Sequence, residues 1–123
     1  MRDVRIAAEV SAALASEYRE KYALDIPEWR VLATLGFRNE ACSAQYISHC
    51  TRTHKSTVSR AVTALMNRKL VERVENKDDR REFVLRLTRQ GRVAFGEYRR
   101  RLNAAFVEHL QGLSRTGKLT PDK

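Results

Sequence analysis

Four polar side chains near the middle of the chain have the types and the spacing to contact nucleic acid: Lys55, Ser56, Thr57 and Arg60. Arg60 falls one helical turn beyond Ser56 and Thr57 in a segment with helical periodicity. When the N-terminal end of a helix enters a major groove, such hydroxyl and guanidinium groups reach base edges, while Lys55 at the helix start meets phosphate. The alternative is that Ser56 is a cap-region residue and Arg60 a solvated or phosphate-contacting charge.

The positive charge of the chain is concentrated in one stretch. The chain has 123 residues and a formal net charge of +9, and residues 52–101 carry 15 basic and 6 acidic side chains against 6 and 7 in residues 1–51. Of the 24 basic residues, 18 are arginine, which suits bidentate recognition of phosphate and guanine edges. The pattern indicates a polyanionic partner, with nucleic acid ahead of a membrane surface. The alternative is a basic soluble protein without such a partner.

Two predicted helices position these side chains. Ser43 fits the N-cap of a short helix from Ala44 to about Cys50, and a second helix from about Lys55 to Lys69 buries the stripe Val58, Ala61, Val62, Leu65 and Met66. Ser56, Thr57, Arg60 and Thr63 lie away from that stripe. Two helices joined by a short polar turn, with small polar and arginine residues outward on the second, are typical of a helix-turn-helix.

The remaining segments predict a mainly α-helical fold with a small β-hairpin. Residues 4–22 and 88–112 have the apolar periodicity of amphipathic helices, and a third helix begins at Pro27 and ends at Gly36. Residues 70–74 and 82–88 are β-prone and enclose a charged turn, so they predict a two-stranded wing. The predicted fold class is a winged helix-turn-helix.

The sequence resembles the MarR family of bacterial winged-helix transcriptional regulators. The motifs that carry the resemblance are PEWRVL at residues 27–32, KSTVSR at 55–60, LVER at 70–73, and DRR at 79–81 followed by LRLT at 85–88 and Gly91. Two features depart from the family pattern. About ten unpatterned residues follow Leu113, where the family has a further dimerisation helix, and Lys69 replaces a glycine.

The resemblance implies roles for three residues of the wing. Arg81 corresponds to the family arginine that enters the minor groove, Asp79 would orient its guanidinium through a bidentate pair, and Arg80 would contact the DNA backbone. The alternative is a solvated charged turn. Arg52, Arg73 and Arg86 are generic candidates for phosphate contacts.

The resemblance also implies a single MarR-like domain over residues 1–123. In it, segments of about 4–24 and 89–113 form dimerisation helices, about 27–88 form the winged helix-turn-helix core, and 114–123 form a tail. The interface would use Ile6, Val10, Leu14, Leu102, Phe106, Leu110 and Leu113. The expected function is a sequence-specific transcriptional regulator, a repressor that binds a pseudo-palindromic double-stranded DNA operator as a homodimer. A small aromatic or anionic effector would weaken DNA binding, and Arg30 and Tyr22 are candidate residues lining its pocket.

The sequence offers little support for other functions. It contains no catalytic constellation, no metal-ligand spacing among His49, His54 and His109, and no membrane span or signal peptide, so we expect no enzyme activity, no metal or other cofactor and a cytoplasmic, nucleoid-associated location. Trp29 and Tyr46 are expected to pack in the core, and Cys42 and Cys50 to be buried or bystander thiols. Two alternatives stay open: a winged-helix module for DNA or protein without ligand sensing, and a basic RNA-associated protein.

Overall fold

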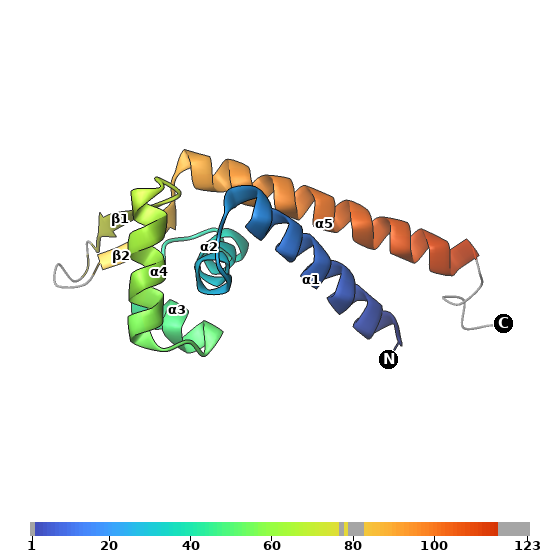
Figure 1. The fold of residues 1–123 in the computed structure, drawn as a ribbon, viewed down its shortest axis with the longest axis horizontal. Helices are drawn as coiled ribbons and strands as arrows, with labels where there is room; N and C mark the ends of the chain where they lie inside the picture. Colours follow the sequence, from blue (N-terminus) through green and yellow to red (C-terminus); the bar gives the residue numbers. More distant parts are fainter. Residues whose placement is uncertain (1, 77, 79–82, 116–123) are drawn as a thin grey trace.

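The computed structural model describes residues 2–76, 78 and 83–115, and of residues 2–8 and 113–115 it describes the backbone alone. The order of elements is α1 (Arg2–Tyr22), α2 (Ile26–Arg38), α3 (Ala44–Thr51), α4 (Lys55–Asn67), β1 (Val71–Glu75), β2 (Phe83–Leu87) and α5 (Arg89–Arg115). The predicted fold class, mainly helical with one antiparallel hairpin, is confirmed. Figure 1 shows α3, α4 and the hairpin together at one end, with α1 and α5 running side by side away from them.

The second helix begins and ends at residues other than those predicted. Asp25 is its N-cap and forms a capping box with Glu28, in which each backbone N–H donates to the other residue's carboxylate at 2.8 Å. Pro27 is therefore the second helical residue. The helix does not end at Gly36 but runs to Arg38, and Asn39 closes it in the left-handed region with a φ of 55°.

Gly36 has a packing role instead. A Cβ atom at Gly36 would lie 2.5 Å from the ring of Phe95, so the missing side chain lets α5 lie close against α2. Phe95 and Tyr98 of α5 are buried there, and Trp29 of α2 contacts Tyr98 edge to face with ring centroids 4.8 Å apart. The expectation that Trp29 packs in the core is thus confirmed.

The core of the winged region is built from the apolar faces of the three central helices. Leu32 and Leu35 of α2, Ile47 of α3 and Leu65 of α4 are almost wholly shielded from solvent. Full burial of a side chain of this size contributes about 1.5–3 kcal/mol to the free energy of unfolding. These contacts hold α4 against α2 and α3.

The hairpin joins this core through residues of both strands. Val71 pairs with Leu87, Arg73 with Leu85 and Glu75 with Phe83 in antiparallel register, and Cys42 adds an isolated bridge to Leu85. Val71, Leu85 and Leu87 face the core, as the period of two requires.

Gly91 explains why the hairpin meets α5 so closely. A Cβ atom at Gly91 would lie 2.1 Å from the carbonyl oxygen of Leu70, which is backbone and cannot move aside as a side chain can. Thr88 Oγ1 donates to the carbonyl of Lys69 at 2.6 Å and accepts from the N–H of Gly91 at 3.1 Å. The start of α5 is therefore tied to the strand that follows α4.

Helices α1 and α5 are held together within one chain. Leu14 and Leu102 belong to the buried core, so they do not form a free surface for a second chain, contrary to the sequence expectation. Two ion pairs join the helices, Lys21 to Glu97 at 2.7 Å and Arg101 to Glu17. Val10 and Phe106 are partly buried, and Leu110 is half-exposed. The side chains of Ile6 and Leu113 are outside the described part of the structure.

Candidate nucleic-acid interface

The start of α4 is closed by an unusual cap. His54 is the N-cap, and its Nδ1 accepts the backbone N–H of Ser56 at 3.1 Å and lies 2.8 Å from the Ser56 hydroxyl. Ser56 is exposed but interacts with the cap through both groups. Lys55, the first helical residue, is exposed beside it. The alternative that Ser56 is a cap-region residue therefore has a structural basis, and its exposure leaves it accessible as well.

The outward face of α4 is a polar ridge. Val58, Ala61, Val62 and Leu65 are buried on the inner face. On the opposite face, at intervals of about one helical turn, are four exposed residues that we call the reading face: Ser56, Arg60, Thr63 and Asn67.

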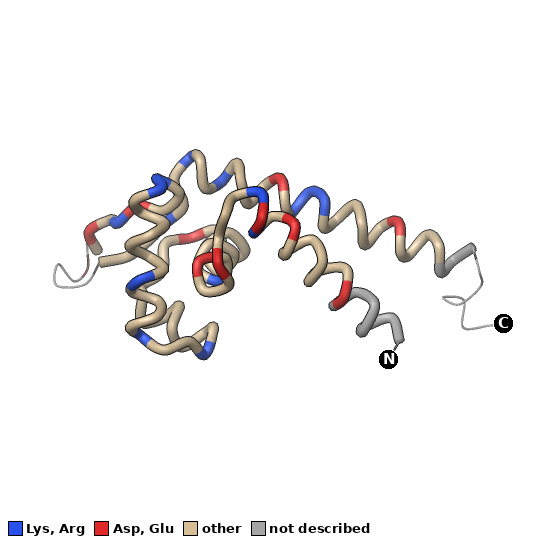
Figure 2. The backbone as a smooth tube through the Cα atoms, in the orientation of Figure 1, with Lys and Arg blue, Asp and Glu red and all other residues tan. Residues whose placement is uncertain are grey.

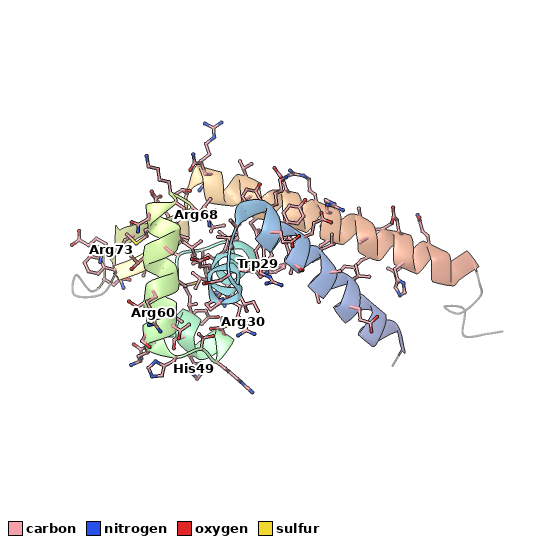
Figure 3. All side chains as sticks on the ribbon, in the orientation of Figure 1. Trp29, Arg30, His49, Arg60, Arg68 and Arg73 are labelled. Atoms are coloured by element: carbon pink, nitrogen blue, oxygen red, sulfur yellow. The ribbon has the colours of Figure 1, made fainter. Side chains whose placement is uncertain are left out.

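Two of the predicted site residues lie on the reading face and two lie beside it. Ser56 and Arg60 are on it, Lys55 precedes it, and Thr57 is half-buried to one side. Thr63 was predicted to lie away from the buried stripe but not to be a site residue, and Asn67 was not predicted, although the spacing of both from Ser56 places them on the same face. Figure 3 shows Arg60 projecting outward from α4, away from α2.

The turn between α3 and α4 is fixed by backbone geometry. Arg52 closes α3 in the left-handed region with a φ of 52°, and its N–H donates to the carbonyl of His49 at 3.3 Å. Ser48 and Thr53 exchange two bonds across the turn, one from the Ser48 hydroxyl at 2.5 Å and one from the Thr53 N–H at 3.0 Å. Ser43 caps α3 by accepting the N–H of Tyr46, as predicted. These contacts fix the turn that joins α3 to α4, the helix that carries the reading face.

Tyr46 is not in the core, contrary to expectation. Its side chain is exposed, the guanidinium of Arg38 lies 4.6 Å from the ring centroid, and Arg38 donates to the phenol oxygen at 2.5 Å. A hydrogen bond from Arg38 to Glu40 raises the pKa of the guanidinium. The periodicity of such a short helix could not distinguish a buried ring from one covered by a cation.

The wing carries charge, but its arginines are not equally available. Arg86 donates from Nε to Glu72 at 2.6 Å, and the guanidinium of Arg73 lies 4.4 Å from the ring centroid of Phe83. The predicted minor-groove residues Asp79, Arg80 and Arg81 lie outside the described residues. Their roles stay predictions.

An open groove of about 730 Å³ lies between α3, α4 and the hairpin. Its walls combine an aromatic ring, aliphatic side chains, hydroxyl groups and one guanidinium, contributed by Ser43, Ala44, Gln45, Ser59, Val62, Thr63, Met66, Asn67, Arg73, Phe83 and Leu85. Because Thr63 and Asn67 also belong to the reading face, a molecule in this groove would sit beside the same surface.

Charge is distributed unevenly over the fold. Figure 2 shows lysine and arginine at both ends and in the middle of α4 and along the first half of α5, whereas acidic residues lie mainly on α1, α2 and the hairpin. Among the described residues, no carboxylate forms an ion pair with Lys55 or Arg60. Lys55 and Arg60 are both exposed, so their positive charges face solvent beside the reading face.

The described residues contain neither a metal-binding cluster nor a membrane span. No three His, Cys, Asp or Glu side chains in the described ranges are grouped to hold a metal ion. Over the same ranges, no helix combines the length and the apolar character needed to cross a membrane.

Comparisons with known proteins give the family and the fold. Residues 24–82 match a sequence model described as the MarR family. No curated protein sequence matches the chain. Among solved structures, RV1404 from Mycobacterium tuberculosis is 19% identical, with a TM-score of 0.77 over 95% of this chain and 78% of that one.

Two further solved structures share the fold. The Multiple Antibiotic Resistance Repressor, MarR, is 15% identical, with a TM-score of 0.74 over 96% of this chain and 85% of that one. NadR, solved in complex with 4-hydroxyphenylacetate, is 19% identical, with a TM-score of 0.73 over 94% and 82%. At these identities the structures establish the fold alone. The family match covers residues 24–82, which contain the helix-turn-helix, and the solved structures share the fold over most of the chain, so the resemblance to the MarR family of transcriptional regulators is confirmed.

Proposed function

We propose that this chain is a repressor that recognises a specific double-stranded DNA sequence. The observation that carries the proposal is the reading face of α4, where Ser56, Arg60, Thr63 and Asn67 project outward from a helix whose opposite side is buried. An α-helix fits the major groove, where each base pair presents a distinct pattern of donors and acceptors. Lys55 and Arg52 beside the reading face supply cationic contacts for phosphates.

The active form is a homodimer on a pseudo-palindromic operator. Leu110 and Val107 are about half-exposed on α5, at the end of the molecule away from the wing (Figure 1), and a second copy would cover them. Twofold symmetry would then place two copies of α4 in successive major grooves, ~34 Å apart. Leu14 and Leu102 would not take part in this dimer interface, because they are already buried within one chain.

The effector is a small aromatic anion that binds in the groove beside the reading face. Arg73 offers a cation and Phe83 an exposed ring in that groove, and Val62 and Met66 add apolar surface. The bound 4-hydroxyphenylacetate of NadR has this chemistry. An occupant here would compete with DNA for the space beside α4.

The protein acts by binding and not by catalysis. This follows the family, whose members regulate transcription. It needs no cofactor, and a chromosomal DNA partner places it in the cytoplasm at the nucleoid.

A competition experiment tests the proposal against its two rivals. Binding is measured by gel shift with the duplex upstream of the chain's own gene, a random duplex of equal length, and a structured RNA. The repressor account expects preference for the upstream duplex and a loss of affinity of about a thousandfold between 50 and 200 mM salt, if about six phosphates are contacted. Equal affinity for all three nucleic acids favours the RNA-associated protein and contradicts the repressor. Specific DNA binding that salicylate and 4-hydroxyphenylacetate leave unchanged favours the module without ligand sensing.

A further inference from the structure

The C-terminal end of α1 leaves backbone carbonyls without partners from its own turn. Ala23 adopts a φ of 54°, its N–H donates to Glu20 at 3.2 Å, and the N–H of Leu24 donates to Arg19 at 2.8 Å. These two bonds make a Schellman motif, which satisfies the carbonyls of Arg19 and Glu20. The carbonyls of Tyr22 and Ala23 point beyond the helix and need donors from elsewhere.

Arg68 supplies both donors from the other end of the winged region. Its Nη1 donates to the carbonyl of Ala23 at 2.7 Å and its Nη2 donates to the carbonyl of Tyr22. Arg68 is itself the C-cap of α4, so one guanidinium fork joins the ends of two helices 45 residues apart in the chain. Figure 3 shows Arg68 at the end of α4 that lies toward the end of α1.

The end of α4 is also held rigidly. Lys69 adopts a φ of 62°, its N–H donates to Met66 at 3.0 Å, and the N–H of Leu70 donates to Leu65 at 3.0 Å. This is a second Schellman motif, and Leu70 is buried behind it. The backbone at Arg68 is therefore held in place, and its guanidinium couples the end of α4 to the end of α1.

The packing gives this bridge its importance. α1 makes its extensive contacts with α5 and lighter ones with α2, whereas α4 packs on α2, α3 and the hairpin. α1 and α4 thus make no extensive packing contact with each other, and the Arg68 hydrogen bonds join their ends directly.

We propose that Arg68 is a positioning residue that sets the orientation of α4 relative to the α1–α5 pair. In the dimer of the proposed function, on which this consequence rests, that orientation fixes the separation of the two reading faces. Arginine suits this position because its planar fork holds two carbonyls in a fixed geometry, whereas the lysine ammonium is a compact charge without that fork.

The first test needs no DNA. Spin labels are attached at cysteines replacing Ser16 of α1 and Thr63 of α4, with Cys42→Ala and Cys50→Ser removing the native thiols, and labelled chains are diluted into unlabelled ones. In Arg68→Gln we expect the interspin distance distribution to broaden about twofold, because the shorter amide lacks the guanidinium fork that reaches both carbonyls, with Arg68→Lys between it and the parent. The charge-matched control Arg99→Gln should keep the parent distribution.

A second readout separates positioning from general structural damage. Each variant selects DNA from a library of inverted half-sites with varied spacing. Arg68→Gln should keep the parent's preferred half-site bases but accept a wider range of spacings, and a circular dichroism melt confirms that it is folded. A parental distance distribution in Arg68→Gln, or equal broadening in Arg99→Gln, overturns the proposal. Failure of the parent to bind DNA instead refutes the proposed function and leaves the distance measurement decisive for Arg68.

Discussion

The exposed polar side chains of α4 differ in their freedom to meet a partner. The Ser56 hydroxyl is 2.8 Å from His54 Nδ1, and the Thr63 hydroxyl donates to the carbonyl of Ser59 at 3.0 Å. Among the described residues, no hydrogen bond or ion pair is formed by the guanidinium of Arg60, which can contact a base without giving up an internal bond. Arg60 is therefore the side chain from which we expect most of the discrimination between DNA sequences.

Arg60→Ala should reduce the ratio of specific to non-specific DNA affinity by about 5- to 150-fold, the value of a bidentate base contact of about 1–3 kcal/mol. Arg99→Ala, which removes the same charge from an exposed site on α5, is the control and should leave the ratio nearly unchanged. Fluorescence anisotropy with selected and scrambled duplexes measures both. An equal loss of specific and non-specific affinity in Arg60→Ala would mean that Arg60 contacts phosphate.

Lys69 is a residue whose backbone conformation does not suit its side chain. Its φ of 62° is one that glycine adopts freely, and glycine stands at this position in the family pattern that the sequence resembles. Lys69→Gly should raise the free energy of unfolding by about 0.5–1 kcal/mol, the relief of left-handed strain less the added freedom of the unfolded chain. Urea unfolding of both proteins measures the difference, and a destabilised variant would show that the Lys69 side chain makes a compensating contact.

The two cysteines should differ in reactivity. Cys42 is buried, and burial raises the pKa of its thiol, whereas Cys50 is exposed on α3. Because the thiolate is the reactive form, a maleimide should modify Cys50 at least about tenfold faster than Cys42 in the folded protein. Mass spectrometry of quenched time points gives both rates, and comparable rates would contradict the packing of Cys42 against the hairpin.

At the scale of elements, close approach between α5 and its neighbours holds the wing in place. Gly91→Ala would push a methyl group into the Leu70 carbonyl and should lower the free energy of unfolding by about 1–3 kcal/mol. Gly112→Ala is the matched control, because nothing lies within 4 Å of its added atom, and it should stabilise the helix by about 0.5–1 kcal/mol. Thermal melts of the two variants should move in opposite directions. Similar changes in melting temperature would mean that the backbone at Leu70 moves aside from the added methyl group at little cost.

The pairing of α1 with α5 should depend on pH. The hydrogen bond from Lys21 lowers the pKa of Glu97, so its stabilising effect is complete above the ordinary glutamate range and is lost as the pH falls through the lowered value. Glu97→Gln should therefore melt below the parent at pH 7 and approach it near pH 3, a value below the ordinary glutamate pKa of about 4.3. Glu108→Gln on the exposed side of α5 should track the parent throughout. A gap between Glu97→Gln and the parent that persists at low pH would mean that Glu97 acts by packing.

The sequence predicted the type and order of the elements because local signals determine them. Ser43 capping α3 and the apolar stripe of α4 are local, and both were found. The errors arose where tertiary contacts decide. Gly36 reads as a helix end until Phe95 of α5 is seen to require its missing side chain, and Arg68 reads as one more basic residue until the end of α1 lies beside it. Such contacts join residues far apart in the chain, and the periodicity of a local segment does not predict them.

At the scale of the whole molecule, the positive charge and the reading face meet at one end and the half-exposed apolar residues of α5 lie toward the other. Figure 1 and Figure 2 show this division between the α3–α4–hairpin region and the distal half of the α1–α5 pair. The arrangement supports a dimer that presents two copies of α4 to one face of a duplex. The spacing of the two DNA half-sites that such a dimer can bind depends on the separation of its two reading faces.

Selection from a random double-stranded DNA library tests the central claim most directly. The purified full chain is incubated with the library, bound duplexes are recovered over several rounds, and the enriched sequences are aligned. The account predicts an inverted repeat whose half-site centres lie about 10 base pairs apart, since two helices enter successive major grooves. Recovery of no common sequence, or of a single site without a repeat, would contradict it.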